Sequence, residues 1–254
     1  MRNLLFILLF ISVKPAIAQD QDQQESAMAA GIKKAMTSES RSEAEIARDR
    51  NRRPVETLDF FGITPDMKIL ELFPGGGWYT KLLAPAMSEK GELHASLGTS
   101  RVKEQLLGQE GFERLQVLET EAEFGAGDKP RLNTINEFSF NKSDFDAVLT
   151  FRNVHNFDAA GRKNINNAVF DALKPGGIYG VVDHTRRHMQ PFTAENRRRA
   201  DPVVIIKEIL DAGFEFVSYS DLHYRADDEL RYEVGRKSVT GNTDRFTFLF
   251  KKPE

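Results

Sequence analysis

The sequence predicts an α/β fold in which helices cover both faces of a mostly parallel sheet. Strand-like and helix-like segments alternate from Lys68 to Lys251, a pattern typical of repeated strand–helix units. The first of these strands leads directly into the glycine triplet Gly75–Gly77, as expected for a loop at a ligand-binding edge. With 254 residues, of which 40% are hydrophobic, the chain is long enough for one sizeable core, and it shows no internal repeat.

The N-terminus has the pattern of a secretory signal peptide over residues 1–18. Arg2 precedes the apolar run Leu4–Val13, and Ala16–Ala18 offers small residues at both recognition positions for cleavage before Gln19. An uncleaved membrane anchor is the alternative, but the run is shorter than the roughly 20 apolar residues that a spanning helix needs. The sequence therefore predicts a periplasmic or secreted protein with no stable membrane span after cleavage.

Charge and composition limit the kinds of partner. The formal charge of −3 becomes −5 once Arg2 and Lys14 leave with the signal peptide, so the chain has no general attraction to nucleic acid. The absence of cysteine excludes disulfides, a thiolate nucleophile and a sulfur-based zinc site, and the five histidines lack the paired spacing of metal ligands. A small-molecule substrate is the expected partner, and the oligomeric state is left open.

The segment after the predicted signal peptide is expected to contain a leader and then a helical cap. Residues 19–37 are predicted to form a flexible leader, since Gln19–Glu25 is polar and without period. A single domain is expected over residues 38–254, beginning with a helical cap over residues 38–63. Pro54 breaks or restarts the helix of this cap, and Gly62 ends it.

Seven strands and four longer helices are predicted beyond the cap. The expected strands are Lys68–Phe73, Glu92–Leu97, Leu115–Thr120, Phe145–Phe151, Ile178–Asp183, Phe214–Tyr219 and Arg245–Lys251. The expected helices are Tyr79–Met87, Ser100–Gln109, Arg162–Leu173 and Pro202–Ala212. The turn Lys174–Gly177 should end the third of these helices, and Gly213 should close the fourth.

The first strand and its glycine loop carry the strongest indication of a ligand site. In an open α/β sheet, ligands bind beyond the carboxyl ends of the strands, and glycines there let the backbone approach a ligand and adopt positive φ. Thr80 stands where a dinucleotide fingerprint requires its third glycine, and no basic residue follows as in a phosphate-binding P-loop. Glu71, inside the strand and just before the glycines, suits a ligand that carries an ammonium group.

Five segments of the chain together have a recognisable pattern: Arg48–Ile63, Glu71–Thr80, Phe145–Phe157, Ala172–His184 and Gly241–Pro253. Through them the chain, from roughly Arg48 to the C-terminus, resembles the class I S-adenosylmethionine-dependent methyltransferases, and specifically a group of predicted, exported bacterial methyltransferases. The resemblance implies a Rossmann-like, doubly wound sheet of seven mostly parallel strands whose last strand is antiparallel. It also implies methyl transfer from S-adenosylmethionine to a small molecule, with an oxygen nucleophile as one option.

The resemblance further implies which residues hold the cofactor. Its glycine-loop motif holds the methionine part of S-adenosylmethionine, and the segment after its fourth strand forms the wall near the transferable methyl group. The residues that correspond are Glu71, Phe73, Gly75, Gly76, Gly77, Phe151 and Asn153. The family usually ends its second strand with an acid that binds both ribose hydroxyls, whereas here only the hydroxyl of Ser96 is offered at that position.

Three residues are candidates for catalysis. Methyl transfer is an in-line displacement at a sulfonium carbon, so the protein mainly supplies proximity, orientation and removal of a proton from the nucleophile. Asp183 and His184 are expected at the end of the fifth strand, with His155 just beyond the fourth, and either histidine could act as a base because its unperturbed pKa is about 6.5. The alternative is structural: His155 packs its loop, and Asp183 starts a turn.

Two basic stretches and two competing functions complete the interpretation. Arg48–Arg53 and Arg186–Arg199 form either a lid that binds an acidic substrate or, as we favour for most of them, solvated helix faces paired with acids.

A non-catalytic ligand-binding or scaffold protein that keeps the fold is the main competing function. A nicotinamide-dependent oxidoreductase is disfavoured by Thr80 and by the missing ribose acid. The chain lacks an N-P-P-Y loop after the fourth strand, so methylation of base amino groups is not expected.

Overall fold

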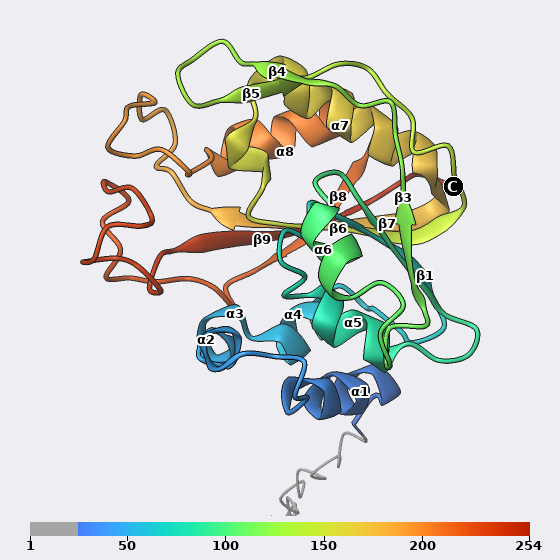
Figure 1. The fold of residues 1–254 in the computed structure, drawn as a ribbon. Coiled ribbons are helices and arrows are strands. Elements are labelled where there is room, and N and C mark those ends of the chain that lie inside the picture. The colour runs from blue at the N-terminus through green and yellow to red at the C-terminus, as the bar shows by residue number, and fades with distance from the viewer. Residues whose placement is uncertain (1–24) are drawn as a thin grey trace, which may run out of the picture.

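In the computed structural model, which describes residues 25–254, seven strands form one sheet in the order β3-β2-β1-β6-β7-β9-β8 (Figure 1). Neighbouring strands are parallel except that β9 runs antiparallel to β7 and β8, which confirms the predicted mostly parallel sheet with an antiparallel last strand. The strands are β1 (Lys68–Leu72), β2 (Glu92–Ser96), β3 (Leu115–Leu118), β6 (Phe145–Phe151), β7 (Leu173–His184), β8 (Glu215–Ser220) and β9 (Arg245–Lys251).

Helices cover both faces of this sheet, because each of its central strands is apolar on both sides. The helices on the N-terminal side of the chain are α1 (Ala27–Met36), α2 (Glu43–Ile46), α3 (Asp49–Arg52), α4 (Pro54–Phe60), α5 (Thr80–Ala86) and α6 (Ser100–Gln105). The later helices are α7 (Ala159–Ala172) and α8 (Pro202–Asp211), preceded by the 3-10 turn η1 (Val154–Asn156). Figure 1 shows α7 and α8 on one side of the sheet and α1, α4 and α5 on the other.

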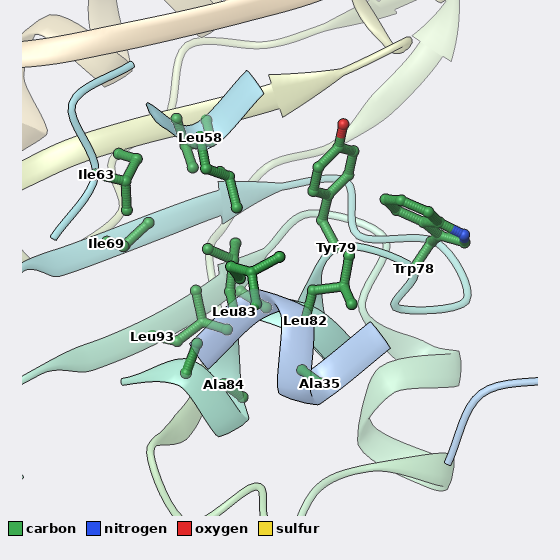
Figure 2. Close-up of a cluster of buried hydrophobic side chains, with 14 of the residues drawn as sticks. Ala35, Leu58, Ile63, Ile69, Trp78, Tyr79, Leu82, Leu83, Ala84 and Leu93 are labelled. Carbon is green, nitrogen blue, oxygen red and sulfur yellow. The ribbon is translucent and has the colours of Figure 1, made fainter. Parts of the chain in front are cut away.

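Two hydrophobic clusters lie on the two faces of the sheet. Alternate residues of β1 divide between them: Ile69 belongs to the cluster under α1, α4 and α5, whereas Leu70 and Leu72 belong to the cluster under α7 and α8. Figure 2 shows the first cluster, with Trp78 and Tyr79 on the side away from Leu93. The glycine loop is thus anchored in the core by the two aromatic residues that follow it.

The topological switch point of the sheet lies between β1 and β6. After β1 the chain continues to β2 and β3 at one edge, then returns to place β6 on the opposite side of β1. Because the connections leave β1 and β6 in opposite directions, a crevice opens beyond their carboxyl ends. The glycine loop therefore stands at the position expected for a ligand site.

Helix α1 corrects the prediction of a flexible leader through residue 37. Ser26 caps the helix by accepting a hydrogen bond from the backbone N–H of Ala29 at 3.1 Å, and Met28, Ile32 and Ala35 are buried along one face. Gly31 lets α1 approach α5 closely, since a Cβ atom there would lie 2.9 Å from the Cβ of Ala86. The apolar stripe is interrupted by small and basic residues, which is why the sequence pattern did not single it out.

Three smaller differences separate the predicted and observed elements. The helical cap consists of α2, α3 and α4 rather than one helix broken at Pro54. A two-stranded hairpin, β4 (Phe124–Ala126) with β5 (Asn133–Ile135), lies where only a loop was expected, because its strands are too short to show alternation. Strand β7 begins at Leu173, and the expected turn Lys174–Gly177 forms an irregularity within its pairing to β6.

The predicted signal peptide, its cleavage before Gln19 and the start of the predicted leader all lie outside the described residues. Within residues 25–254, none of the helices combines the length and the apolar character needed to cross a bilayer.

Candidate functional site

A cavity of about 710 Å³ opens at the carboxyl ends of β1 and β6, at the topological switch point. Its walls are the segment from Glu39 to Arg52, the loop from Glu71 to Gly76 with Trp78 and Tyr79, part of α6, and Phe151–Asn153 after β6. The volume falls within the range of about 300–1,000 Å³ that small-molecule and cofactor sites occupy. Of the predicted cofactor residues, Glu71, Phe73, Gly75, Gly76, Phe151 and Asn153 line this cavity.

The two positive-φ glycines of the loop have different neighbours. Gly77 has a φ of +77°, and a Cβ atom there would lie 2.6 Å from Leu106 Cδ1, so this glycine lets the loop pack against the residues that follow α6. Gly75 has a φ of +61°, and its nearest neighbour would be the Arg101 guanidinium at 3.7 Å. Gly75 therefore faces open space in the cavity, while Gly77, which does not line the cavity, supports the loop from behind.

The backbone is also strained at the ends of three adjacent strands. Phe73 after β1, Leu97 after β2 and Arg152 after β6 all have positive φ values, of 52°, 62° and 64°. Left-handed conformations at non-glycine residues are uncommon and concentrate at functional sites. They are three of the ten non-glycine residues with positive φ in residues 25–254, and they follow three neighbouring strands at the edge where the cavity opens.

Glu71 is a buried carboxylate at the floor of the cavity. Its side chain accepts a hydrogen bond from the Thr80 hydroxyl at 2.6 Å, and burial raises the pKa of Glu71 to about 7, against the smaller lowering by Thr80 and by the charge of Arg52. Within residues 25–254 no cation forms an ion pair with Glu71. Thr80, which stands where a dinucleotide fingerprint requires glycine, fixes the orientation of this carboxylate.

The end of β2 does not bring Ser96 to the cavity, contrary to the prediction that its hydroxyl contacts the cofactor. Ser96 is fully buried, and its Oγ donates a hydrogen bond to the carbonyl of Leu118 in β3 at 3.1 Å. Arg101 and Gln105 of α6 line the cavity on this side instead. Sequence reasoning missed both, because neither matches the carboxylate that the family places here.

Phe151 and Asn153 lie at the end of β6 as predicted and line the cavity. The Phe151 ring stacks on Tyr79 with ring centroids 3.5 Å apart. Asn153 Nδ2 donates to the carbonyl of Phe151 at 3.0 Å and to that of Phe73 at 3.4 Å. The Asn153 amide thus ties the ends of β1 and β6 together across the switch point.

The three predicted catalytic residues come together, but they do not line the large cavity. Asp183 is fully buried; one of its carboxylate oxygens accepts from His155 Nδ1 at 2.5 Å and from the His184 backbone N–H at 2.6 Å, and the other accepts from the His155 backbone N–H at 3.0 Å. His184 Nδ1 is hydrogen bonded to the Thr243 hydroxyl at 2.8 Å. His155 lines a separate cavity of about 100 Å³, and neither Asp183 nor His184 lines this cavity or the large one.

His184 is held neutral in this cluster. Burial lowers its pKa well below the ordinary value for histidine, and the positive charge of Arg245 acts in the same direction. His184 is therefore not a group that gains a proton near neutral pH. The structural interpretation of Asp183, as an anchor for the loop after β6, describes the observed hydrogen bonds directly.

The two predicted basic stretches divide between ion pairs and the cavity. Arg53 pairs with Glu56, and the fully buried Arg199 forms a bidentate pair with Asp228 at 2.9 and 3.0 Å, as expected for arginines matched by acids. Arg48 and Arg52, however, line the large cavity. Arg152, which the sequence analysis did not single out although it stands between Phe151 and Asn153, lines it as well. No group of three potential metal-ligating residues occurs within residues 25–254.

No protein-family model and no curated protein sequence matches the chain. Among solved structures, an S-adenosylmethionine-dependent methyltransferase from Aquifex aeolicus is similar at a TM-score of 0.54 and 15% identity, covering 88% of this chain and 97% of that one. The cyclase SpnF is similar at 0.54 and 12% identity, covering 89% and 93%. The glycopeptide N-methyltransferase MtfA in complex with sinefungin is similar at 0.53 and 14% identity, covering 81% and 87%.

At these identities the similarity shows the fold alone. The chain has the fold of the class I methyltransferases, as its strand order and its antiparallel β9 require. One of the similar structures is described as a cyclase, so the fold does not by itself specify the reaction. The function must be argued from the cavity.

Proposed function

We propose that the protein binds S-adenosylmethionine in the large cavity and transfers its methyl group to a small-molecule acceptor. The observation that carries this proposal is the buried carboxylate of Glu71 beneath a glycine loop, at the switch point of a class I methyltransferase fold. When bound, S-adenosylmethionine supplies an electrophilic methyl group on a sulfonium. The methyltransferases among the similar structures support the choice of this cofactor.

The residues of the cavity fit the methionine end of the cofactor. Glu71 offers an acceptor for an ammonium group. A bound cation would offset the burial that raises the pKa of Glu71, because its side chain has no ion-pair partner within residues 25–254. Gly75 and Gly76 leave the backbone open to a close approach. At the ribose end, the side chains of Arg101 and Gln105 supply donors in place of the usual acid.

The protein's own contribution would then be orientation and, for an oxygen acceptor, removal of a proton. Because carboxylate oxygens only accept hydrogen bonds, the contact with Asp183 places a hydrogen on Nδ1 of His155 and leaves Nε2 to take a proton. His155 lies in the small cavity, so this role requires the acceptor to extend from the large cavity toward it. His184 and Asp183 would act by positioning His155.

Calorimetric titration of the full chain with S-adenosylmethionine tests this proposal. We expect binding with a dissociation constant in the micromolar range. Glu71→Gln should raise this constant at least tenfold, and Gly75→Val should abolish binding. NAD serves as the parallel control and is not expected to bind, because Thr80 replaces the third glycine of the dinucleotide fingerprint. No heat of binding at millimolar S-adenosylmethionine would exclude the enzyme.

A non-catalytic ligand-binding or scaffold protein is the second candidate function. The observation in its favour is that no carboxylate at the end of β2 lines the cavity, where the family usually binds the ribose. An assay with S-adenosylmethionine that carries a labelled methyl group, and with cell extract as the source of acceptors, separates the two functions. Binding with no labelled product would favour the second.

We also propose that the protein is exported, as the signal-like pattern of residues 1–18 and the resemblance to exported methyltransferases suggest. N-terminal sequencing of the protein from a periplasmic fraction tests this. A mature chain that begins at Gln19 is expected, and recovery of the intact N-terminus from the cytoplasm would contradict it.

A further inference from the structure

Of the five arginines that line the large cavity, only Arg41 forms an ion pair within residues 25–254, and Arg52 and Arg152 are the least exposed of the other four. Arg41, Arg53 and Arg199 each pair with a carboxylate, at 2.5, 3.0 and 2.9 Å. Within residues 25–254, neither Arg52 nor Arg152 forms such a pair, although both line the cavity. No carboxylate of the described residues therefore lies within ion-pair distance of either guanidinium, although the charge of Arg52 acts on the Glu71 carboxylate.

Arg52 is 6% exposed, and its guanidinium lies over the indole ring of Trp78, 4.2 Å from the ring centroid. The aromatic face stabilises the cation but carries no charge that could neutralise it. Burial lowers the pKa of Arg52 to about 9, and the positive charge of Arg152 is the next cause. The two guanidiniums thus act on each other at the wall of one cavity.

Arg152 follows β6 in a left-handed conformation, and its Nε is buried without a hydrogen-bond partner within residues 25–254. Burial lowers the pKa of Arg152, and among the acids the charge of Asp183 acts most strongly in the opposite direction. The oxygens of Asp183 are already occupied by His155 and by the backbone of His184. Arg245, whose Nε is also buried without a partner, adds a third positive charge beside Tyr79.

A buried guanidinium without a counter-ion is costly, and the cost falls when an anion binds. The lining of the cavity as a whole carries an excess of positive charge, since it contains six basic residues and three carboxylates. Arginine prefers carboxylate and phosphate groups, whose paired oxygens match its planar fork of N–H donors. An oxyanion is therefore the ligand that these side chains lack.

We propose that Arg52 and Arg152 bind an oxyanion of the methyl acceptor, a carboxylate or a phosphate, in the large cavity. The identification of the anion with the acceptor rests on the proposed function, in which Phe151 and Asn153 wall the methyl position and Arg152 stands between them. The acceptor is then a small anionic molecule. The anion site itself is independent of that function.

The sole tryptophan of the chain reports on this site, because Trp78 contacts the Arg52 guanidinium. We suggest titrating the full chain with sodium phosphate and, separately, with succinate while following Trp78 fluorescence, with sodium chloride holding the ionic strength constant. A saturable change is expected for at least one anion, and the tighter one identifies phosphate or carboxylate as the preferred group. The dissociation constant should rise at least tenfold in Arg52→Gln and Arg152→Gln.

Three further variants make the titration decisive. Arg231→Gln removes one exposed arginine that does not line the cavity and should leave the dissociation constant unchanged. Arg152→Lys, which keeps the charge but loses the planar fork, should bind more weakly than the wild type and more tightly than Arg152→Gln. Binding lost in Arg101→Gln but retained in Arg152→Gln would place the anion at the glycine loop and overturn the proposal. No saturable change with either anion would also overturn it.

Calorimetry with S-adenosylmethionine separates this proposal from the proposed function. If Arg152→Gln binds S-adenosylmethionine like the wild type but has lost the anion, the acceptor assignment is supported. If Arg152→Gln loses S-adenosylmethionine as well, the arginines serve the cofactor's own carboxylate, and the acceptor assignment fails. If the wild type binds the anion but not S-adenosylmethionine, the anion site stands and the methyltransferase function fails.

Discussion

Two groups of polar side chains lie at the same edge of the sheet and differ in how far the protein itself satisfies them. In the cluster of His155, Asp183 and His184, the buried carboxylate accepts three hydrogen bonds from within the chain. In the large cavity, Glu71 has no ion-pair partner and Arg52 and Arg152 have no acid partner among residues 25–254. The sequence patterns pointed to the first group for catalysis.

From this contrast we infer that unmet hydrogen-bonding and charge requirements identify a ligand site better than residue type does. Groups that are satisfied internally stabilise the fold, and replacing them should destabilise it. Groups that are buried and unsatisfied reduce stability until a ligand arrives, and replacing them should stabilise the protein while removing binding. The variants below test whether the two groups behave in these opposite ways.

The largest effect is expected from Asp183→Ala. Removing this buried carboxylate leaves three donors of His155 and His184 without an acceptor, so the free energy of unfolding should fall by about 3–5 kcal/mol. Urea unfolding at pH 7 measures it. A loss below about 1 kcal/mol would show that the cluster is not a structural anchor.

Glu71→Gln should increase the free energy of unfolding at high pH, whereas Asp183→Ala decreases it. Since the folded-state pKa of Glu71 is raised to about 7, the unfolded chain releases this proton first, and stability falls as the pH rises from the ordinary glutamate value toward 7. The variant should therefore be more stable than the wild type by about 3 kcal/mol at pH 8, with the difference vanishing near pH 4. Urea unfolding at both pH values checks the sign, and a pH-independent difference would contradict it.

Substitutions at the two glycines of the loop, Gly75 and Gly77, form a matched pair with intermediate effects on stability. Gly77→Ala should cost about 2–3 kcal/mol, because the new Cβ adds a collision with Leu106 to the strain of positive φ. Gly75→Ala should cost only about 1 kcal/mol, since its Cβ faces the cavity. Thermal unfolding of both variants measures the difference, and equal losses would mean that Gly75 also packs against the protein.

The smallest effect on stability is expected from Arg152→Gln. Removing a partly buried positive charge, whose Nε is buried without a hydrogen-bond partner, should raise the free energy of unfolding by about 1 kcal/mol in a buffer free of polyvalent anions. The gain should shrink as the anion that binds the wild type is added, because ligand binding stabilises only the wild type. Destabilisation by this variant at all anion concentrations would assign Arg152 a structural role.

Much of the fold could be predicted because its local patterns agree with its packing. All seven sheet strands were expected within a few residues, since buried central strands are apolar runs bounded by turns. Helix α1 and the short hairpin β4–β5 could not be predicted in this way. The stability of α1 comes from packing against α5, and that of the hairpin from cross-strand pairing, rather than from a long periodic pattern.

The site could be predicted only in part. Glu71 and Gly75 were found because strand, acid and glycines lie next to one another in the chain. The partner of Ser96 and the exclusion of His155 from the large cavity depend on side-chain directions that spacing does not determine. Arg52 and Arg152 are 100 residues apart in the sequence, and it is the fold of the sheet that brings them to one cavity.

A crystal structure of the protein with sinefungin, the compound bound in the similar MtfA structure, would show whether a cofactor-like ligand binds at Glu71. We expect the ligand in the large cavity, with its α-amino group within hydrogen-bond distance of the Glu71 carboxylate and its amino-acid end against Gly75. A ligand bound instead in the small cavity beside His155, or no ligand at millimolar sinefungin, would contradict this expectation.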